Sequence, residues 1–169
     1  MGPTRSATLS FAEHVSAVGS IGVLGGPAGV RSVGWRLNPE PASTEPDETV
    51  QQAVVQLGEY FAGHRRAFDV PLDLPAMPPA TRAVLEALQT IGYGETITYA
   101  QLAVRSGTGL PARAIGSVMG ANPVPIVIPC HRVVASGGLG GYSGGEPGRE
   151  LATKRWLLEL EGALPPALF

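Results

Sequence analysis

The sequence predicts an α/β protein of two small domains, a mixed α/β N-terminal piece followed by a mostly helical C-terminal piece. Three observations support this prediction. β-Branched residues and glycines alternate over residues 14–37, prolines gather at positions 75–79, and the apolar pattern beyond them becomes helical. No apolar run approaches the roughly 20 residues that span a membrane. We therefore expect one domain at residues 1–75 and a second at 76–169.

The N-terminal half carries strand signals and then one helix. Residues 14–37 predict two or three strands joined by turns, with a break at Gly25-Gly26-Pro27. Asp47 is expected to cap a helix whose apolar positions follow the i, i+3, i+4, i+7 rule. These positions are Val50, Ala53, Val54, Leu57, Tyr60 and Phe61. The alternating run at residues 68–74 predicts a last edge strand.

The C-terminal half predicts three short helices and a rigid loop. The first helix carries an apolar stripe, and the second and third lie near residues 99–105 and 111–121, across a turn at Gly107-Thr108-Gly109. Two short helices across a glycine turn are typical of a helix-turn-helix. The stripe consists of Val84, Leu85, Leu88 and Ile91. Three prolines within residues 122–134 predict a rigid extended segment.

Charge and cysteine content restrict the function. The net charge is −2, with −3 in residues 1–75 and +1 in residues 76–169, so any DNA contact should lie in the second half and be small. A single cysteine excludes an internal disulfide and fits a reducing, cytoplasmic location. The spacing of the one cysteine and the three histidines, His14, His64 and His131, shows no four-ligand zinc site. We expect neither a metal nor another cofactor.

Cys130 is the candidate nucleophile. It stands before His131 and Arg132, and nearby positive charge raises the fraction of thiolate, which is the reactive form. Glu161 shares the inward face of the last predicted helix with Leu151, Lys154 and Leu158, where a buried carboxylate needs a partner such as His131. The three residues would then act as nucleophile, base and orienter. The alternatives are a buried structural thiol and a solvated Glu161.

Several motifs together resemble the O6-alkylguanine-DNA alkyltransferase (methylated-DNA–protein-cysteine methyltransferase) family, over about residues 68–162. They are Pro129-Cys130-His131-Arg132-Val133, Asn122-Pro123, Gly141-Tyr142-Ser143-Gly144-Gly145, Gly94-Glu95-Thr96, Tyr99 with Leu102 and Ala103, Arg113-Ala114, and Lys154 with Trp156, Leu157, Leu158 and Glu161. The resemblance implies a ribonuclease-H-like N-terminal support domain and a winged helix-turn-helix domain that binds DNA and carries the chemistry.

The resemblance also implies a role for each catalytic residue. Cys130 would irreversibly accept the alkyl group of O6-alkylguanine, and of O4-alkylthymine, in duplex DNA. His131 would deprotonate Cys130 through a water molecule and would be held by Glu161. Asn122 would lock the turns between the helix-turn-helix and the active site. Tyr99 would donate a hydrogen bond or proton to the leaving base, which lowers the cost of charge on it.

DNA binding is implied for the third helix. Arg113 would fill the gap left by a flipped nucleotide, and small neighbours would allow close approach to the backbone. These neighbours are Ala112, Ala114, Gly116 and Ser117. The substrate pocket would be formed by Pro125, Val133, Tyr142 and Ser143, with the Ser143 backbone facing O6. The implied partner is duplex DNA, with no membrane, and the protein is expected to be a monomer able to cluster on DNA.

Two other classes of function remain open at this point. One is a DNA-binding lesion sensor or regulator that transfers nothing. The other is a cysteine hydrolase, although no oxyanion motif or glycine elbow surrounds Cys130. The chain also departs from the family pattern at Ala80, Leu85 and Gly92, and its loop between Ser143 and Lys154 is longer than usual.

Overall fold

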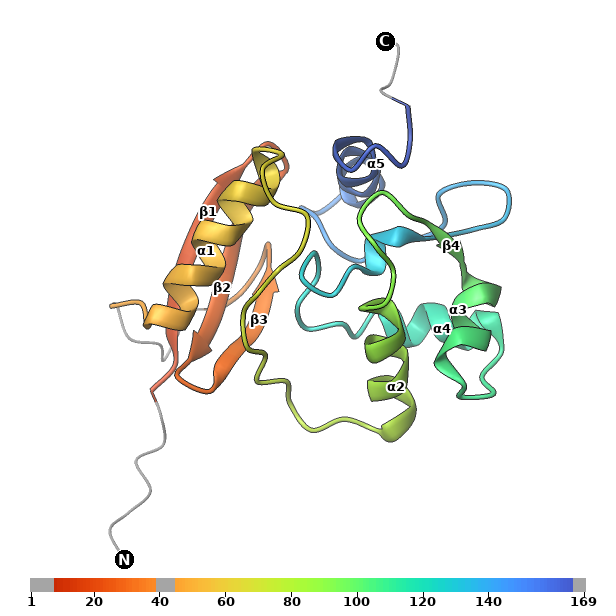
Figure 1. Ribbon diagram of the computed structural model, residues 1–169, viewed down its shortest axis with the longest axis horizontal. Coiled ribbons are helices and arrows are strands. Elements are labelled where there is room, and N and C mark those ends of the chain that lie inside the picture. Colours follow the sequence, from red (N-terminus) through yellow and green to blue (C-terminus); the bar gives the residue numbers. More distant parts are fainter. Residues whose placement is uncertain (1–7, 39–44, 166–169) are drawn as a thin grey trace, which may run out of the picture. The chain divides into compact units, whose positions relative to one another are not determined.

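The computed structural model describes residues 8–38 and 45–165. The chain divides into two compact units, Met1–Pro75 and Ala76–Phe169. Figure 1 colours the strands of the first unit red to orange and the helices of the second unit green to blue. The predicted order, a mixed α/β piece before a mostly helical piece, is confirmed.

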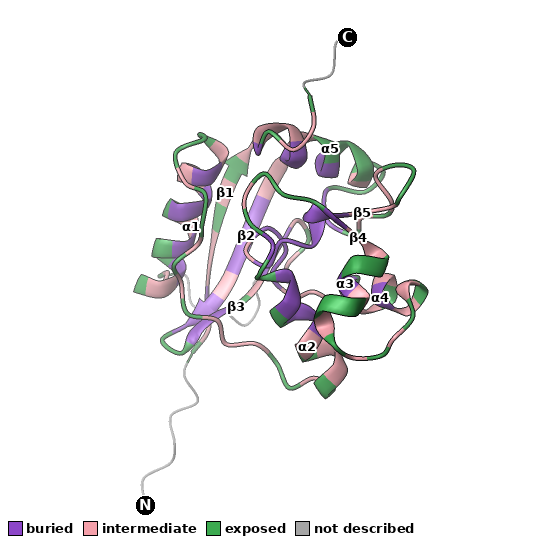
Figure 2. Ribbon diagram, turned by 45° about the vertical axis from the view of Figure 1, so that its right-hand side comes forward, coloured by how far each residue is buried: buried purple, intermediate pink, exposed green. Residues whose placement is uncertain are grey.

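The first unit is a three-stranded antiparallel sheet with one helix against it. The strands β1 (Ser10–Ser16), β2 (Gly19–Gly26) and β3 (Gly29–Gly34) lie in sequence order, and α1 (Glu48–Phe61) packs on the sheet (Figure 1). As predicted, Asp47 caps α1, and its Oδ1 accepts a hydrogen bond from the Thr49 amide at 2.9 Å. Buried residues, purple in Figure 2, lie on both the sheet and the helix, and the apolar ones form the core of this unit. They are Ile21, Val23, Val30, Val33, Val50, Ala53, Leu57 and Tyr60.

The prediction of an edge strand at residues 68–74 was wrong. Only Leu72 forms a bridge, a parallel one with Val30, through bonds from the Val30 amide to the Pro71 carbonyl and from the Asp73 amide to the Val30 carbonyl. Pro71 has no amide proton to continue a ladder. The Gln56 side chain on α1 binds both the amide and the carbonyl of Asp69, which takes these groups away from strand pairing.

Over its described residues, 76–165, the second unit contains four α-helices and two very short strands. These are α2 (Pro79–Leu88), β4 (Ile97–Thr98), α3 (Tyr99–Ser106), α4 (Ala112–Met119), β5 (Val133–Val134) and α5 (Glu150–Leu160). The predicted helix-turn-helix is confirmed as α3 and α4. A capping box between Thr98 and Gln101 starts α3, and Gly107 ends it with a φ of 65°, a left-handed conformation that favours glycine.

The segment at residues 122–134 is not extended as predicted. It folds into tight turns, and the Ile128 amide donates to the Val124 carbonyl at 2.9 Å. Ile126 lies at a φ of 73°, which is uncommon for a β-branched residue. Residues Cys130–Arg132 then form one turn of 3₁₀ helix, η1. The prolines fix individual φ angles, but hydrogen bonds across the loop close it.

None of the helices in the described ranges is long and apolar enough to cross a membrane.

Candidate active site

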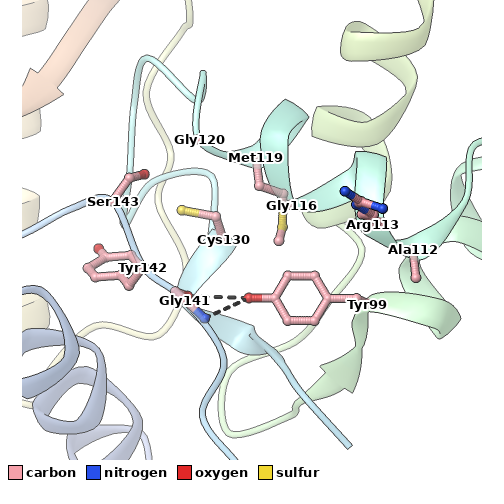
Figure 3. Close-up of a pocket in the computed structure, with 10 residues that line it drawn as sticks. All are labelled: Tyr99, Ala112, Arg113, Gly116, Met119, Gly120, Cys130, Gly141, Tyr142 and Ser143. Atoms are coloured by element: carbon pink, nitrogen blue, oxygen red, sulfur yellow. Dashed lines mark hydrogen bonds between the residues drawn. The ribbon is translucent and has the colours of Figure 1, made fainter.

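Cys130 lies at the floor of a pocket in the second unit. The pocket has a volume of about 620 Å³, within the range of sites that take small molecules. Only 7% of Cys130 is exposed. Burial raises the pKa of the thiol, whereas a hydrogen bond with Asn122 and the charge of Lys154 oppose that rise. The lining residues are Tyr99, Ala112, Arg113, Gly116, Met119, Gly120, Cys130, Gly141, Tyr142 and Ser143 (Figure 3).

Asn122 closes the turns that lead from α4 to Cys130. Its side-chain amide donates to the Ile128 carbonyl at 2.9 Å, and its side-chain oxygen accepts from the Val124 amide at 3.0 Å. The Cys130 amide donates to the same Ile128 carbonyl at 2.8 Å. One side chain therefore fixes both ends of the loop, and with them the position of the thiol.

His131 and Glu161 form a buried pair that does not line the pocket. His131 Nε2 lies 2.8 Å from Glu161 Oε1, and both side chains are fully buried. Glu161 comes from the C-terminal cap of α5, and Arg132 also binds it, with Nη2 2.8 Å from Oε1 and Nε 3.0 Å from Oε2. Hydrogen bonds from both partners hold the pKa of Glu161 at about 2 although burial opposes this, so the carboxylate is ionised at neutral pH.

The second ring nitrogen of His131, Nδ1, takes no part in the contact with Glu161. Nδ1 is buried and has no hydrogen-bond partner within the described ranges. Burial lowers the pKa of His131, and the positive charges of Arg132 and Lys154 add to this, while Glu161 opposes it. A neutral imidazole that donates from Nε2 to Glu161 carries its lone pair on Nδ1. The arrangement therefore provides a buried base next to the thiol in the chain.

Lys154 holds the loop that follows β5. Its buried ammonium donates to three carbonyls, those of Val133 at 2.7 Å, Leu139 at 2.6 Å and Gly141 at 2.8 Å. Burial lowers the pKa of Lys154 to about 8, so the group is still mostly charged at neutral pH. Lys154 binds carbonyls at both ends of this loop. It therefore fixes the wall of the pocket that residues 141–143 form.

Tyr99 lines the pocket with its hydroxyl directed at Gly141 of this wall (Figure 3). Its hydroxyl donates to the Gly141 carbonyl at 3.3 Å and accepts from the Gly141 amide at 3.1 Å. A Cβ at Gly140 would lie 2.7 Å from the Tyr99 hydroxyl, so glycine is required there for the ring to approach. The site thus presents a phenol within the same cavity as the thiol.

The structure brings together only part of the predicted DNA-binding and pocket residues. Arg113, Ala112 and Gly116 on α4 line the pocket with Tyr142 and Ser143. The remaining predicted residues, Ala114, Ser117, Pro125 and Val133, are not among the described residues that line it. Pro125 and Val133 are buried beside the Cys130 segment, and Ser117 is exposed on α4.

Two important residues were missed as members of the site, Arg132 and Lys154. The sequence did offer a signal for Lys154, which shares a helical stripe with Leu158 and Glu161. Leu151, expected on the same face, is instead 53% exposed because it lies in the first turn of α5. Over residues 8–38 and 45–165, no group of three or more His, Cys, Asp or Glu side chains could hold a metal ion.

Comparison with known proteins matches both units to one family. The 6-O-methylguanine DNA methyltransferase DNA binding domain matches residues 79–163, and the ribonuclease-like domain of the same family matches residues 16–74. A methylated-DNA–protein-cysteine methyltransferase of Methanosarcina acetivorans is 36% identical, over 92% of this chain and 99% of that protein. A protein of the same name from Mycolicibacterium paratuberculosis is 46% identical, over 79% and 73%.

A solved structure also matches both units. The crystal structure of Mycobacterium tuberculosis OGT in complex with DNA has a TM-score of 0.75 and 37% identity, and the match covers 91% of this chain and 93% of that one.

Proposed function

Since the chain belongs to the 6-O-methylguanine DNA methyltransferase family, we propose that Cys130 takes the alkyl group of O6-alkylguanine onto its own sulfur. The protein repairs DNA by direct transfer of an alkyl group from methylated DNA to a cysteine of its own, the activity that its relatives' names state. The observation that carries the assignment is that the only cysteine of the chain lies at the floor of the pocket, next in sequence to His131.

The transfer is a single displacement at the alkyl carbon. His131 takes the thiol proton, the sulfur–carbon bond forms, and the carbon–O6 bond breaks with its electron pair going to guanine. Tyr99 donates a hydrogen bond or proton to the leaving base, which requires its hydroxyl to leave the Gly141 carbonyl. The thioether product has no good leaving group, so each molecule reacts once.

Tyr142 and Ser143 wall the alkyl side of the pocket in this proposal, and the Ser143 backbone faces O6 of the base. The cavity of about 620 Å³ has room for a purine and its adduct. The smaller O4-alkylthymine carries a comparable alkyl ether and is proposed as a second substrate. Lys154 keeps this wall in place through its bond to the Gly141 carbonyl.

Duplex DNA is the partner, and α4 is the proposed contact. A base inside the duplex cannot reach a buried sulfur, so the nucleotide must be flipped out, and Arg113 at the pocket rim would fill the gap. Because all lining residues come from one unit of one chain, we propose that a monomer is sufficient. The unpaired thiol fits work in a reducing compartment, the cytoplasm.

Intact mass measurement tests the proposed function directly. After incubation with excess duplex that contains O6-methylguanine, the protein is expected to gain the mass of one methylene group and then stop, and peptide mapping should place the gain on Cys130. A DNA-binding regulator would gain nothing, and a hydrolase would turn over without a lasting gain. Either result would contradict the proposal.

Arg113→Ala should slow transfer from duplex DNA by about 10- to 100-fold, because the unstacked gap is no longer filled and flipping costs a few kcal/mol. Transfer from free O6-benzylguanine, which needs no flipping, should change little. Arg82→Ala, which removes an exposed arginine on α2 away from the pocket lining, is the charge-matched control. Equal losses of Arg113→Ala on both substrates would show that Arg113 does not act on the base stack.

A further inference from the structure

Glu161 is shared between two partners, His131 and Arg132, and Arg132 lies outside the nucleophile, base and orienter set. Oε1 contacts both His131 Nε2 and Arg132 Nη2 at 2.8 Å, and Oε2 accepts from Arg132 Nε at 3.0 Å. The exposed fractions of the three side chains are 0% for His131 and Glu161 and 9% for Arg132. Arg132 therefore contacts both oxygens of the carboxylate, whereas His131 contacts one, and all three side chains are almost completely buried.

We propose that Arg132 is a positioning residue for alkyl transfer, which holds Glu161 as an anion and balances its charge so that His131 rests as a neutral base. This inference rests on the proposed function and deepens it. A carboxylate alone beside an imidazole favours the protonated ring, which cannot accept the thiol proton. A carboxylate already paired with a guanidinium still orients the ring but favours protonation less.

The hydrogen-bond pattern agrees with a base that is ready for one proton. An ionised carboxylate can only accept, so Nε2 of His131 must be the donor and the lone pair must lie on Nδ1. Nδ1 is buried without a hydrogen-bond partner within the described ranges. When the thiol proton moves from Cys130 Sγ to Nδ1, directly or through water, the thiolate and the imidazolium form together, and Glu161 then stabilises the imidazolium.

The charged groups around His131 act in opposite directions. Glu161 raises its pKa, while burial and the positive charges of Arg132 and Lys154 lower it, and the net direction is downward. Two further titratable groups belong to the same network, the Cys130 thiol and the Tyr142 phenol, which interacts with Cys130 and Glu161, and burial raises the pKa of each. Both therefore rest uncharged at neutral pH. Arg132 is the cation in direct contact with Glu161.

Arg132 also has a structural contact, so the test must separate two roles. Nη1 donates to the Ile91 carbonyl at 2.7 Å just beyond α2, and the guanidinium carbon lies 5.9 Å from the centre of the Tyr93 ring. A purely structural arginine would affect stability and rate at every pH. An arginine that sets the protonation of His131 would also shift the midpoint of the His131 titration.

The first measurement uses the unaltered protein without DNA. The chain has three histidines, so labelled Cε1 carbons give three NMR signals, and His131→Gln identifies the signal of His131. We expect the midpoint of the His131 titration to lie below the ordinary value of 6.5, because burial and the charges of Arg132 and Lys154 lower the pKa of this ring. A midpoint at or above 6.5 would overturn the inference. This measurement requires no transfer, so it stands whether or not the chain repairs DNA.

The second measurement compares Arg132→Gln, which removes the charge, with Arg132→Lys, which keeps it. We expect the glutamine variant to raise the His131 midpoint by about one pH unit. The acidic limb of the single-turnover transfer rate should move upward by the same amount, and lysine should restore both. Arg155→Gln, which removes an exposed arginine from α5, should leave both unchanged.

Three results would overturn the inference. In the first, the rate of the glutamine variant falls while its midpoint and pH profile stay those of the unaltered protein, so that Arg132 is structural only. In the second, lysine shifts the midpoint as far as glutamine does. The third is a high midpoint in the unaltered protein, and this result decides the matter even if the glutamine variant does not fold. A mass experiment that fails while His131 remains neutral would instead reject the proposed function.

Discussion

Cys130→Ser is expected to reduce alkyl transfer by at least about a thousandfold, while binding to lesion-containing duplex is retained. A serine hydroxyl ionises far less readily than a thiol and is a much weaker nucleophile in the same position. The chain has no other cysteine, so no second thiol can take over. Transfer is measured in single turnover with a labelled methyl group, and binding is measured by gel shift on the same duplex.

The control for this variant is Ser136→Ala, an exposed change in the loop after β5 that should leave transfer and binding intact. Binding should survive in Cys130→Ser because the proposed DNA contacts lie on α4 and not on the thiol. Transfer by Cys130→Ser at the normal rate would show that another group is the acceptor. Loss of both activities would contradict the separation of binding from chemistry.

Glu161→Gln is expected to lower the free energy of unfolding by about 3–5 kcal/mol at neutral pH, because it leaves Arg132 buried without its anion. Alkyl transfer should fall as well, since a glutamine holds His131 less firmly. Urea denaturation at pH 7 measures the stability. Glu159→Gln, two residues away in a partly exposed pair with Arg155 at 3.7 Å, should cost less than about 1 kcal/mol. A similar cost for both variants would contradict the assigned role of Glu161.

The dependence of stability on pH in the acidic range tests the role of Glu161 independently. The pKa of Glu161 is about 2 in the folded protein, below its ordinary value of 4.5. Ionised Glu161 therefore stabilises the native state above about pH 4.5, and this contribution is lost as the pH falls from 4.5 toward 2. Thermal unfolding over this range should show a smaller loss in Glu161→Gln than in the unaltered protein. An identical acid dependence would rule out this linkage.

Local rules predicted much of the fold. Asp47 caps α1 because a carboxylate can accept from the free amides of the first turn. The change from strand to helical periodicity predicted that helices follow the strands, and the turn at Gly107 predicted the helix-turn-helix. For the site, Cys130, His131 and Glu161 could be grouped for two reasons. The thiol is followed directly by a histidine and an arginine, and the carboxylate lies on an apolar helical face, where it needs a partner.

The remaining features depend on contacts between distant residues, which no local pattern records. Residues 68–74 alternate between apolar and acidic residues like a strand. However, the Gln56 side chain on α1 forms hydrogen bonds with both the amide and the carbonyl of Asp69. The turns before Cys130 depend on the Asn122 side chain reaching Ile128. Arginine is usually exposed, so the sequence gives no sign that Arg132 is buried. Its burial depends on the ion pair with Glu161, which comes from the C-terminal cap of α5.

Burial of the Cys130 thiol protects a molecule that works only once. Electrophiles and oxidants of the cell attack exposed thiolates first, and a thiol that is 7% exposed with a raised pKa rests largely protonated. Small reactive metabolites therefore consume it slowly. The pool of active protein is drawn down by DNA lesions and not by general chemical stress, and the number of remaining unreacted molecules records how many lesions the cell has met.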